Sequence, residues 1–217
     1  MKLPALPMLV TLLLGACGNT PPVPDWQMNA KGAMERAQDA YLSGNTRVET
    51  AEFAKARSEV SSTGRTDLLA RIELARCATR VASLVFEDCT GFSALAQDAP
   101  APERAYAAYL AGRAQPLDAA LLPQQHRAFA GVDGQPAPAL KSVADPLARL
   151  VAAGVLLQTR RADPLTVDTA IDTASAQGWR RPLLAWLGVQ AQRAEQAGDV
   201  AEAARIRRRM VLAGDGK

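Results

Sequence analysis

Two cysteines, Cys77 and Cys89, are the first residues whose chemistry needs an explanation. They lie twelve residues apart in "RCATRVASLVFEDC", and the chain has 3 cysteines in total. Two such thiols can form a disulfide, bind a metal or carry out redox chemistry. A redox pair is typically spaced as C-x-x-C, which the sequence lacks. A metal site needs more ligands than the single histidine, His126, can add.

The other candidates for catalysis are few. Asp168 and Asp172 lie one helical turn apart, and paired carboxylates can do acid–base work in glycosidases. A solvated helix face is the simpler interpretation of this pair. We interpret His126 as a partly buried or surface residue near a helix end. No nucleophile motif or glycine-rich phosphate loop is present. We therefore expect no catalytic site, no metal and no cofactor.

The strongest run of charge is "RIRRRM" at 205–210. On a helix that buries Ile206 and Met210, the side chains of Arg205, Arg208 and Arg209 point outward. Arginine offers paired donors to lipid headgroups, lipopolysaccharide phosphates, peptidoglycan carboxylates or an acidic protein. The alternative is that these arginines only complement the negative end of the helix dipole.

The first residues of the chain indicate export. Lys2 precedes an apolar stretch at 3–14, which is shorter than the roughly 20 residues that a membrane span requires. A short basic region, an apolar region and small residues after it are typical of a secretory signal peptide.

The residues that follow this stretch predict where the exported protein would be located. "LGAC" at 14–17 resembles the lipobox of bacterial lipoproteins. The resemblance implies that residues 1–16 are removed and that Cys17 becomes the lipidated first residue. Gly18 rather than Asp follows it, which in that family implies the periplasmic face of the outer membrane. The Pro-rich residues 17–24 would form a tether. An ordinary signal peptide with an unrelated cysteine is the alternative.

The expected periplasmic location favours a disulfide between Cys77 and Cys89, because the periplasm is oxidising and Cys17 would be used by the anchor. Twelve residues of unbroken helix would separate the two Cα atoms by about 18 Å. A disulfide requires about 4.4–6.8 Å. The helix that carries Cys77 must therefore end before Cys89, with "FEDCTG" folding back along it.

Composition and periodicity predict an all-α fold. The chain is 48% hydrophobic but only 5% aromatic, so its apolar content is mostly helix-favouring Ala and Leu with Val. The formal net charge of +3 is near neutral for 217 residues, and neither this charge nor the export signal suggests binding to nucleic acid. Apolar residues recur at three- and four-residue spacing.

This spacing predicts about ten helices within a domain at 25–217. The expected buried stripe of the second helix is Val48, Ala51, Phe53 and Ala56, and that of the third extends from Leu68 to Phe86. "GVDGQPAPAL" at 131–140 is the longest loop signal, and it is the boundary if the domain divides into two subdomains. The expected helices lie at 26–44, 48–64, 66–86, 92–96, 102–110, 117–129, 146–160, 164–177, 182–197 and 199 onward.

The last 30 residues suggest how these helices pair. "LLAWLGVQAQRAEQAGDVAEAARIRRRM" resembles a tetratricopeptide repeat, with Leu187-Gly188 and Ala203 at matching positions. Its first helix is about three residues longer than the family pattern. The resemblance implies antiparallel helical hairpins in a stacked array. An irregular helical bundle is the alternative.

These observations favour an outer-membrane lipoprotein, anchored through Cys17, that binds a protein or cell-wall partner without catalysis. One alternative is an envelope enzyme that acts on peptidoglycan. Another is a purely structural component of the envelope or of a secretion assembly.

Overall fold

The computed structural model describes residues 22–131 and 136–215. These residues form ten α-helices, two 3-10 helices and no β-strand, which confirms the all-α fold class. The elements are α1 (Asp25–Leu42), α2 (Thr46–Ser61), α3 (Thr66–Ala82), α4 (Thr90–Ser93), α5 (Ala101–Leu110), η1 (Pro116–Leu121), η2 (Gln124–Phe129), α6 (Pro136–Ser142), α7 (Pro146–Gln158), α8 (Pro164–Ala176), α9 (Arg180–Gln196) and α10 (Val200–Asp215).

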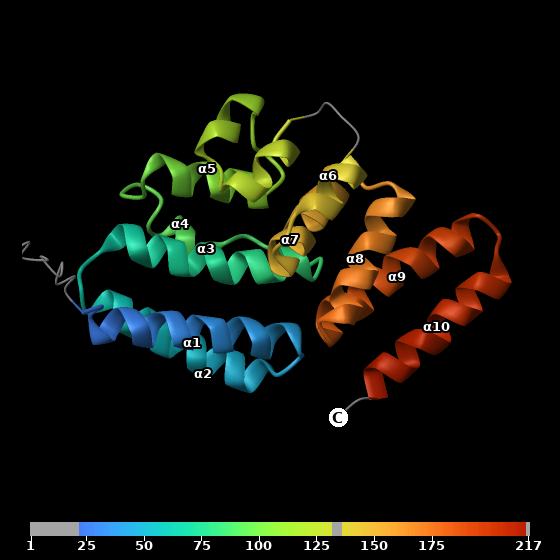
Figure 1. Ribbon diagram of the computed structural model, residues 1–217, viewed down its shortest axis with the longest axis horizontal. Coiled ribbons are helices and arrows are strands. Elements are labelled where there is room, and N and C mark those ends of the chain that lie inside the picture. The colour runs from blue at the N-terminus through green and yellow to red at the C-terminus, as the bar shows by residue number, and fades with distance from the viewer. Residues whose placement is uncertain (1–21, 132–135, 216–217) are drawn as a thin grey trace, which may run out of the picture.

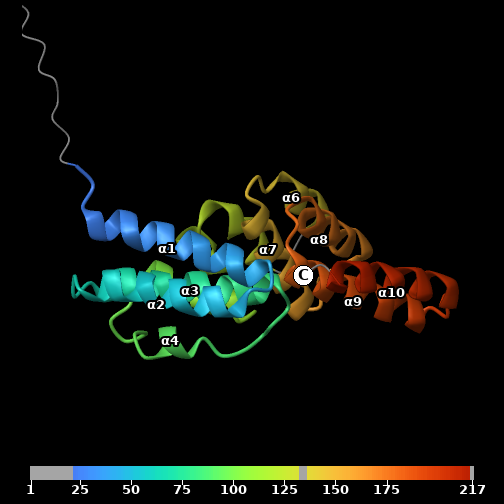
Figure 2. The same cartoon turned by 90° about the horizontal axis from the view of Figure 1, so that it is seen from below.

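Helix α3 lies in the interior of the arrangement. Figure 1 shows the α1–α2 hairpin on one side of α3, with α5 on the other side. Helix α7 packs on α3 and continues the array through α8 and α9. Helix α10 packs on α9 at the end opposite to the start of α1, so the molecule is elongated (Figures 1 and 2).

Short polar signals fix where several helices begin. Asp145 accepts a hydrogen bond from the Ala148 N–H at 2.6 Å, and Asp163 accepts one from the Thr166 N–H at 2.6 Å. In both helices proline occupies the first turn, where no N–H is needed. Asp199 caps α10 in the same way, with its Oδ1 2.9 Å from the Glu202 nitrogen. These three helix starts confirm the sequence-based predictions.

Helices α3 and α7 approach each other closely at one glycine. A Cβ atom added to Gly154 would lie 2.3 Å from the Val81 carbonyl oxygen. Beside this crossing, the fully buried Trp186 donates a hydrogen bond from Nε1 to the Ala82 carbonyl at 3.2 Å. The crossing therefore joins α3, α7 and α9 in one core.

Tyr41 joins distant parts of the chain. The guanidinium carbons of Arg80 and Arg181 lie 4.6 and 4.2 Å from the centre of its ring. Arg181 Nε also donates a hydrogen bond to the Tyr41 carbonyl at 2.7 Å. Cation–π contacts and this bond therefore connect the end of α1 to α3 and α9.

The predicted buried stripes are partly wrong. In α2 the buried face is Glu49, Phe53, Ala56 and Val60, whereas Val48 is 40% exposed. A buried carboxylate thus takes a position where the periodicity predicts an apolar residue. In α3 the helix ends at Ala82, and Phe86 lies beyond it at 42% exposed. Because several helices pack on α3, its buried residues do not form one narrow stripe.

Two predictions in the middle of the chain are also wrong. Residues 117–129 do not form one helix, because Leu122 adopts an extended backbone before Pro123 and separates η1 from η2. The predicted loop at 131–140 contains the start of α6, which begins at Pro136. Proline is tolerated in the first turn of a helix, so Pro136 and Pro138 do not prevent it.

The C-terminal residues form the expected hairpin. Helices α9 and α10 pack antiparallel, with Leu187 and Ala203 buried and Gly188 in ordinary contact with Met210. Buried residues from both sides of 131–140 pack in one hydrophobic cluster. The resemblance to a tetratricopeptide repeat and the division into subdomains stay predictions.

We predict that Gly154→Ala lowers the free energy of unfolding by about 2 kcal/mol, because the added methyl group overpacks the α3–α7 crossing. Gly188→Ala is the matched control. Its added Cβ meets only Met210 Cε at 3.9 Å, so alanine's better helix propensity should raise stability by up to about 1 kcal/mol. Urea unfolding of both variants measures the difference, and equal effects would contradict the close approach.

Candidate functional site

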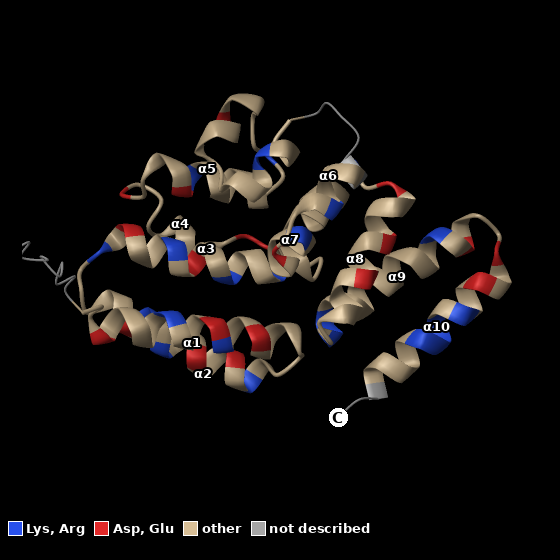
Figure 3. Cartoon of the chain, viewed as in Figure 1, with Lys and Arg blue, Asp and Glu red and all other residues tan. Residues whose placement is uncertain are grey.

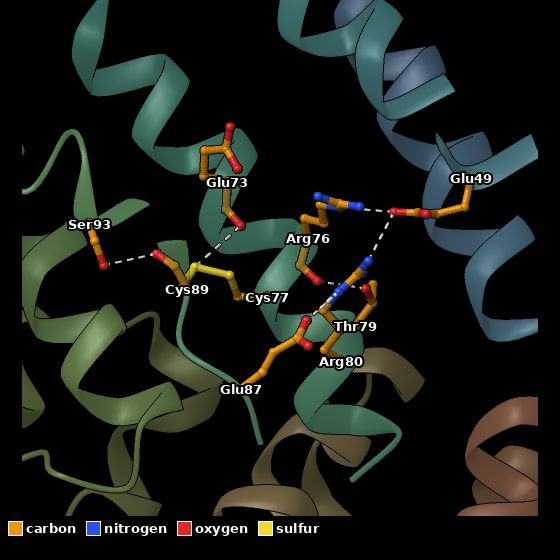
Figure 4. The surroundings of a disulfide bond; sticks show 9 residues. All are labelled: Glu49, Glu73, Arg76, Cys77, Thr79, Arg80, Glu87, Cys89 and Ser93. Carbon is orange, nitrogen blue, oxygen red and sulfur yellow. Dashed lines mark hydrogen bonds and ion pairs between the residues drawn. A yellow bond between two sulfur atoms is a disulfide. The ribbon is translucent and has the colours of Figure 1, made fainter. Parts of the chain in front are cut away.

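The predicted disulfide is present in the structure. Cys77 lies on α3 and Cys89 directly precedes α4, and their Cα atoms are 5.9 Å apart. Residues 83–89 run back along α3, as the sequence predicted from the helix geometry (Figure 4). Oxidised Cys89 has no hydrogen to donate, and its Sγ lies 3.8 Å from the Glu73 carbonyl oxygen. This bond attaches the returning segment to the middle of α3.

Charged groups lie on the side of α3 that faces α2, away from the disulfide (Figure 4). Glu49 is 2% exposed, and its Oε1 accepts hydrogen bonds from Arg76 Nε at 2.9 Å and Arg80 Nη2 at 3.4 Å (Figure 4). Arg80 also pairs with Glu87 of the returning segment at 2.9 Å. One guanidinium therefore connects α2, α3 and the segment that leads to Cys89.

A second buried carboxylate supports the turn that follows Cys89. Glu73 is 5% exposed and accepts a hydrogen bond from Arg57 Nε of α2 at 2.8 Å. A Cβ atom on Gly91 would lie 2.0 Å from Glu73 Oε2, so any larger residue would displace this carboxylate from its present position. The groups around the disulfide thus hold the segment in place, which agrees with a structural role for Cys77 and Cys89.

The basic run of the last helix follows the helical pattern only in part, because Arg209 is half-buried. Figure 3 shows its Lys and Arg positions gathered along the middle of α10. Arg205 is exposed and pairs with Glu202 at 2.5 Å, and Arg207 pairs with Glu195. Arg208 is exposed and Arg209 half-buried, and no ion pair involves either within residues 22–131 and 136–215. A contact of Arg205, Arg208 and Arg209 with an anionic partner stays a prediction.

Cys17 and the rest of the signal segment lie outside the described residues. Asp168 and Asp172 are exposed on α8, and Asp168 accepts a hydrogen bond from Gln190 at 2.9 Å. They therefore belong to a solvated helix face. Across the described chain, no helix is both long and apolar enough to span a membrane, and no three potential metal ligands come together.

His126 is the residue whose surroundings differ most from the sequence interpretation. It is 2% exposed and belongs to the wall of a cavity of about 500 Å³ between α3, α5, the two 3-10 helices and α7. The wall is mostly apolar and includes Leu74, Leu122 and Val151. Ligand pockets in proteins are typically roughly 300–1,000 Å³ and are lined in this way.

An ion pair forms one part of the cavity wall. Arg71 Nε of α3 donates a hydrogen bond to Glu103 Oε1 of α5 at 2.5 Å. The Glu103 side chain is 7% exposed, whereas that of Arg71 is 60% exposed. The other carboxylate oxygen, Glu103 Oε2, is buried and has no hydrogen-bond partner among the described residues. Half of this buried carboxylate therefore lacks a donor.

Aromatic rings form another part of the wall. The His126 ring centre lies 5.5 Å from that of Tyr106 and 5.0 Å from that of Tyr109. Burial lowers the pKa of His126 from 6.5 to about 4, so the imidazole is neutral at pH 7. Burial raises the pKa of Tyr106, and the nearby Asp145 carboxylate adds to this rise. Asp145 is exposed and also lines the cavity.

Sequence reasoning missed this cavity. Its polar groups Arg71, Glu103, His126 and Asp145 come from α3, α5, η2 and the residue that caps α7. No short motif joins them. The sequence gives no signal for the cavity beyond Asp145, which directly precedes the predicted helix at 146–160. No protein-family model, curated protein or solved structure matches this chain.

We predict that replacing Cys77 and Cys89 together by serine lowers the free energy of unfolding by about 3 kcal/mol, because the unfolded chain loses a covalent constraint. Urea unfolding with and without reductant provides the measurement. Reductant should lower the stability of the wild type and leave the double variant unchanged. Two free thiols in protein purified without reductant, found by mass spectrometry, would contradict the bond.

The neutral, buried state of His126 predicts a pH-dependent stability. Its folded-state pKa of about 4 lies below the unfolded value near 6.5, so the unfolded chain binds a proton more readily. The stability that neutral His126 contributes to the folded state is fully present above pH 6.5 and declines as the pH falls toward 4. Between pH 7 and pH 5 the free energy of unfolding should fall by about 2 kcal/mol from this group.

His126→Phe tests this, because phenylalanine keeps an aromatic ring in the cluster and does not titrate. Urea unfolding at pH 7 and pH 5 should show a smaller pH dependence in the variant than in the wild type. Asp67, whose pKa is lowered to about 2 by its hydrogen bond with Arg65, titrates below this range. An identical pH dependence in both proteins would show that His126 is accessible to protons in the folded state.

Proposed function

We propose that this chain is a lipoprotein anchored through Cys17 at the periplasmic face of the outer membrane, where its helical domain binds a partner without catalysing a reaction. The proposal begins with the resemblance of "LGAC" at 14–17 to the lipobox and with the Pro-rich residues that follow. Three acyl chains would exceed the two signals that stable membrane anchoring requires.

The observation that carries the proposal is how the three cysteines divide. Cys77 and Cys89 form a disulfide at a Cα separation of 5.9 Å, which leaves Cys17 as the odd cysteine. Disulfides persist in oxidising compartments such as the periplasm and are rare in the cytosol. The paired cysteines and the signal segment are independent features, and both favour export.

Binding is favoured over catalysis by the state of the acidic groups in the cavity. Glu103 and Asp145 line the same cavity, as a peptidoglycan-acting enzyme would require of its two carboxylates. Each has one oxygen engaged in the fold, because Arg71 binds Glu103 Oε1 and the Ala148 N–H binds Asp145 Oδ2 at 2.6 Å. These contacts favour a binding role for the cavity over the hydrolase alternative.

The experiment is labelling of the expressed protein with radioactive palmitate, followed by separation of inner and outer membranes. The wild type should incorporate label and fractionate with the outer membrane, whereas Cys17→Ser should incorporate none and keep residues 1–16. The double Cys77→Ser/Cys89→Ser variant is the control and should be labelled like the wild type. Label in Cys17→Ser, or unlabelled wild type in the cytosol, would overturn the anchor.

A further inference from the structure

The cavity beside α3 has the dimensions of a small-molecule site. Its volume of about 500 Å³ suits a compact organic ligand, and Leu74, Leu122 and Val151 provide an apolar surface for the ligand's body. Its walls come from α3, α5, η1, η2 and α7, which hold these side chains in fixed positions. A ligand in this cavity would therefore meet a preformed surface.

The charged groups of the cavity favour a cation. Glu103 and Asp145 each contribute a carboxylate, whereas Arg71 is the single cationic side chain on the described wall. His126 is buried among aromatic rings and adds no positive charge at neutral pH. The wall thus carries one more negative than positive charge, and a cationic ligand would balance it.

Two residues that line the wall also have a polar atom that no other described residue binds and that is itself covered by protein. Glu103 is 6% exposed and its Oε2 has no hydrogen-bond partner among the described residues. His126 is 2% exposed, and its Nδ1 lacks a partner in the same part of the chain. A buried polar atom without a partner costs about 1–3 kcal/mol. The protein itself therefore leaves part of the hydrogen-bonding capacity of the Glu103 carboxylate unused.

We infer that the cavity binds a small amphipathic amine, with its ammonium group at the carboxylates of Glu103 and Asp145 and its apolar body against Leu74, Leu122 and Val151. The tilted rings of Tyr106 and His126 add aromatic faces that attract a cation. This inference gives the proposed binding module a ligand class. It does not depend on lipidation, so the outcome of the palmitate experiment leaves it unchanged.

The first experiment compares three probes that share an apolar body and differ in their polar group. These are 2-phenylethylamine, 2-phenylethanol and 3-phenylpropanoate, titrated into the full-length protein at pH 7 and followed by NMR. The amine should bind at least tenfold more tightly than the alcohol and the carboxylate. Equal affinity for the amine and the alcohol, or tighter binding of the carboxylate, would overturn the inference.

The second experiment removes the charge of Asp145 and keeps its role as a helix cap. Asparagine caps helices as well as aspartate, so Asp145→Asn should fold normally. The variant should bind 2-phenylethylamine severalfold more weakly than the wild type does. Its affinity for 2-phenylethanol should be unchanged. Asp163→Asn is the matched control, because Asp163 caps α8 with the same 2.6 Å geometry and does not line this cavity.

Glu103→Gln provides an additional measurement, with an expected loss of at least tenfold in amine affinity. If that variant fails to fold without Arg71's partner, Asp145→Asn decides the question. Unchanged amine affinity in Asp145→Asn, or an equal loss in Asp163→Asn, would overturn the assignment of the ammonium group to these carboxylates.

Discussion

The position of α3 between other helices is the constraint on which the rest of the structure depends. Helices α1, α2, α5 and α7 all pack on α3, so its polar side chains cannot all reach water. Its arginines therefore extend to buried carboxylates on both sides, to Glu49 of α2 and to Glu103 of α5. Its own Glu73 is bound in turn by Arg57 of α2. Each pair joins two helices.

Such pairs act on specificity more than on net stability. The Coulomb attraction of a buried pair is offset by the loss of hydration, and replacing both partners by apolar residues is often neutral. Removing the arginine is different, because it leaves a buried carboxylate without its partner. The exposure of Arg57 and Arg71 makes this loss smaller than the roughly 3–5 kcal/mol of a fully buried pair. Alternative registers of α2 or α5 against α3 would separate Glu49 and Glu103 from their arginines. The pairs therefore favour one arrangement of these helices.

The same constraint explains what could be predicted from the sequence. Local signals such as Asp145, Asp163 and the prolines that follow them give helix starts correctly, because a cap needs only its own first turn. The buried faces of α2 and α3 were harder to predict. Glu49 is charged and buried because arginines of another helix neutralise it, and periodicity within α2 contains no information about them. Likewise, Leu122 before Pro123 breaks a segment that composition alone describes as helix.

The candidate sites also differ in whether the sequence could predict them. The pairing of Cys77 and Cys89 was predicted from their spacing, from helix geometry and from the expected oxidising compartment. The cavity could not be predicted from the sequence, because Arg71, Glu103 and His126 are brought together only by the packing of three separate elements. A single histidine without neighbouring ligands gives no indication that it is buried. Its environment is a property of the tertiary structure.

The contact between Tyr41 and Arg181 has a consequence for the order in which the chain folds. The two residues are 140 positions apart, and closing so long a loop is slow because of its entropy. The disulfide closes a loop of only twelve positions, and α1 and α2 are neighbours along the chain. As a newly made chain emerges N-terminus first, the first hairpin and the disulfide loop can form early. The end of α1 gains its last partner only when α9 has emerged.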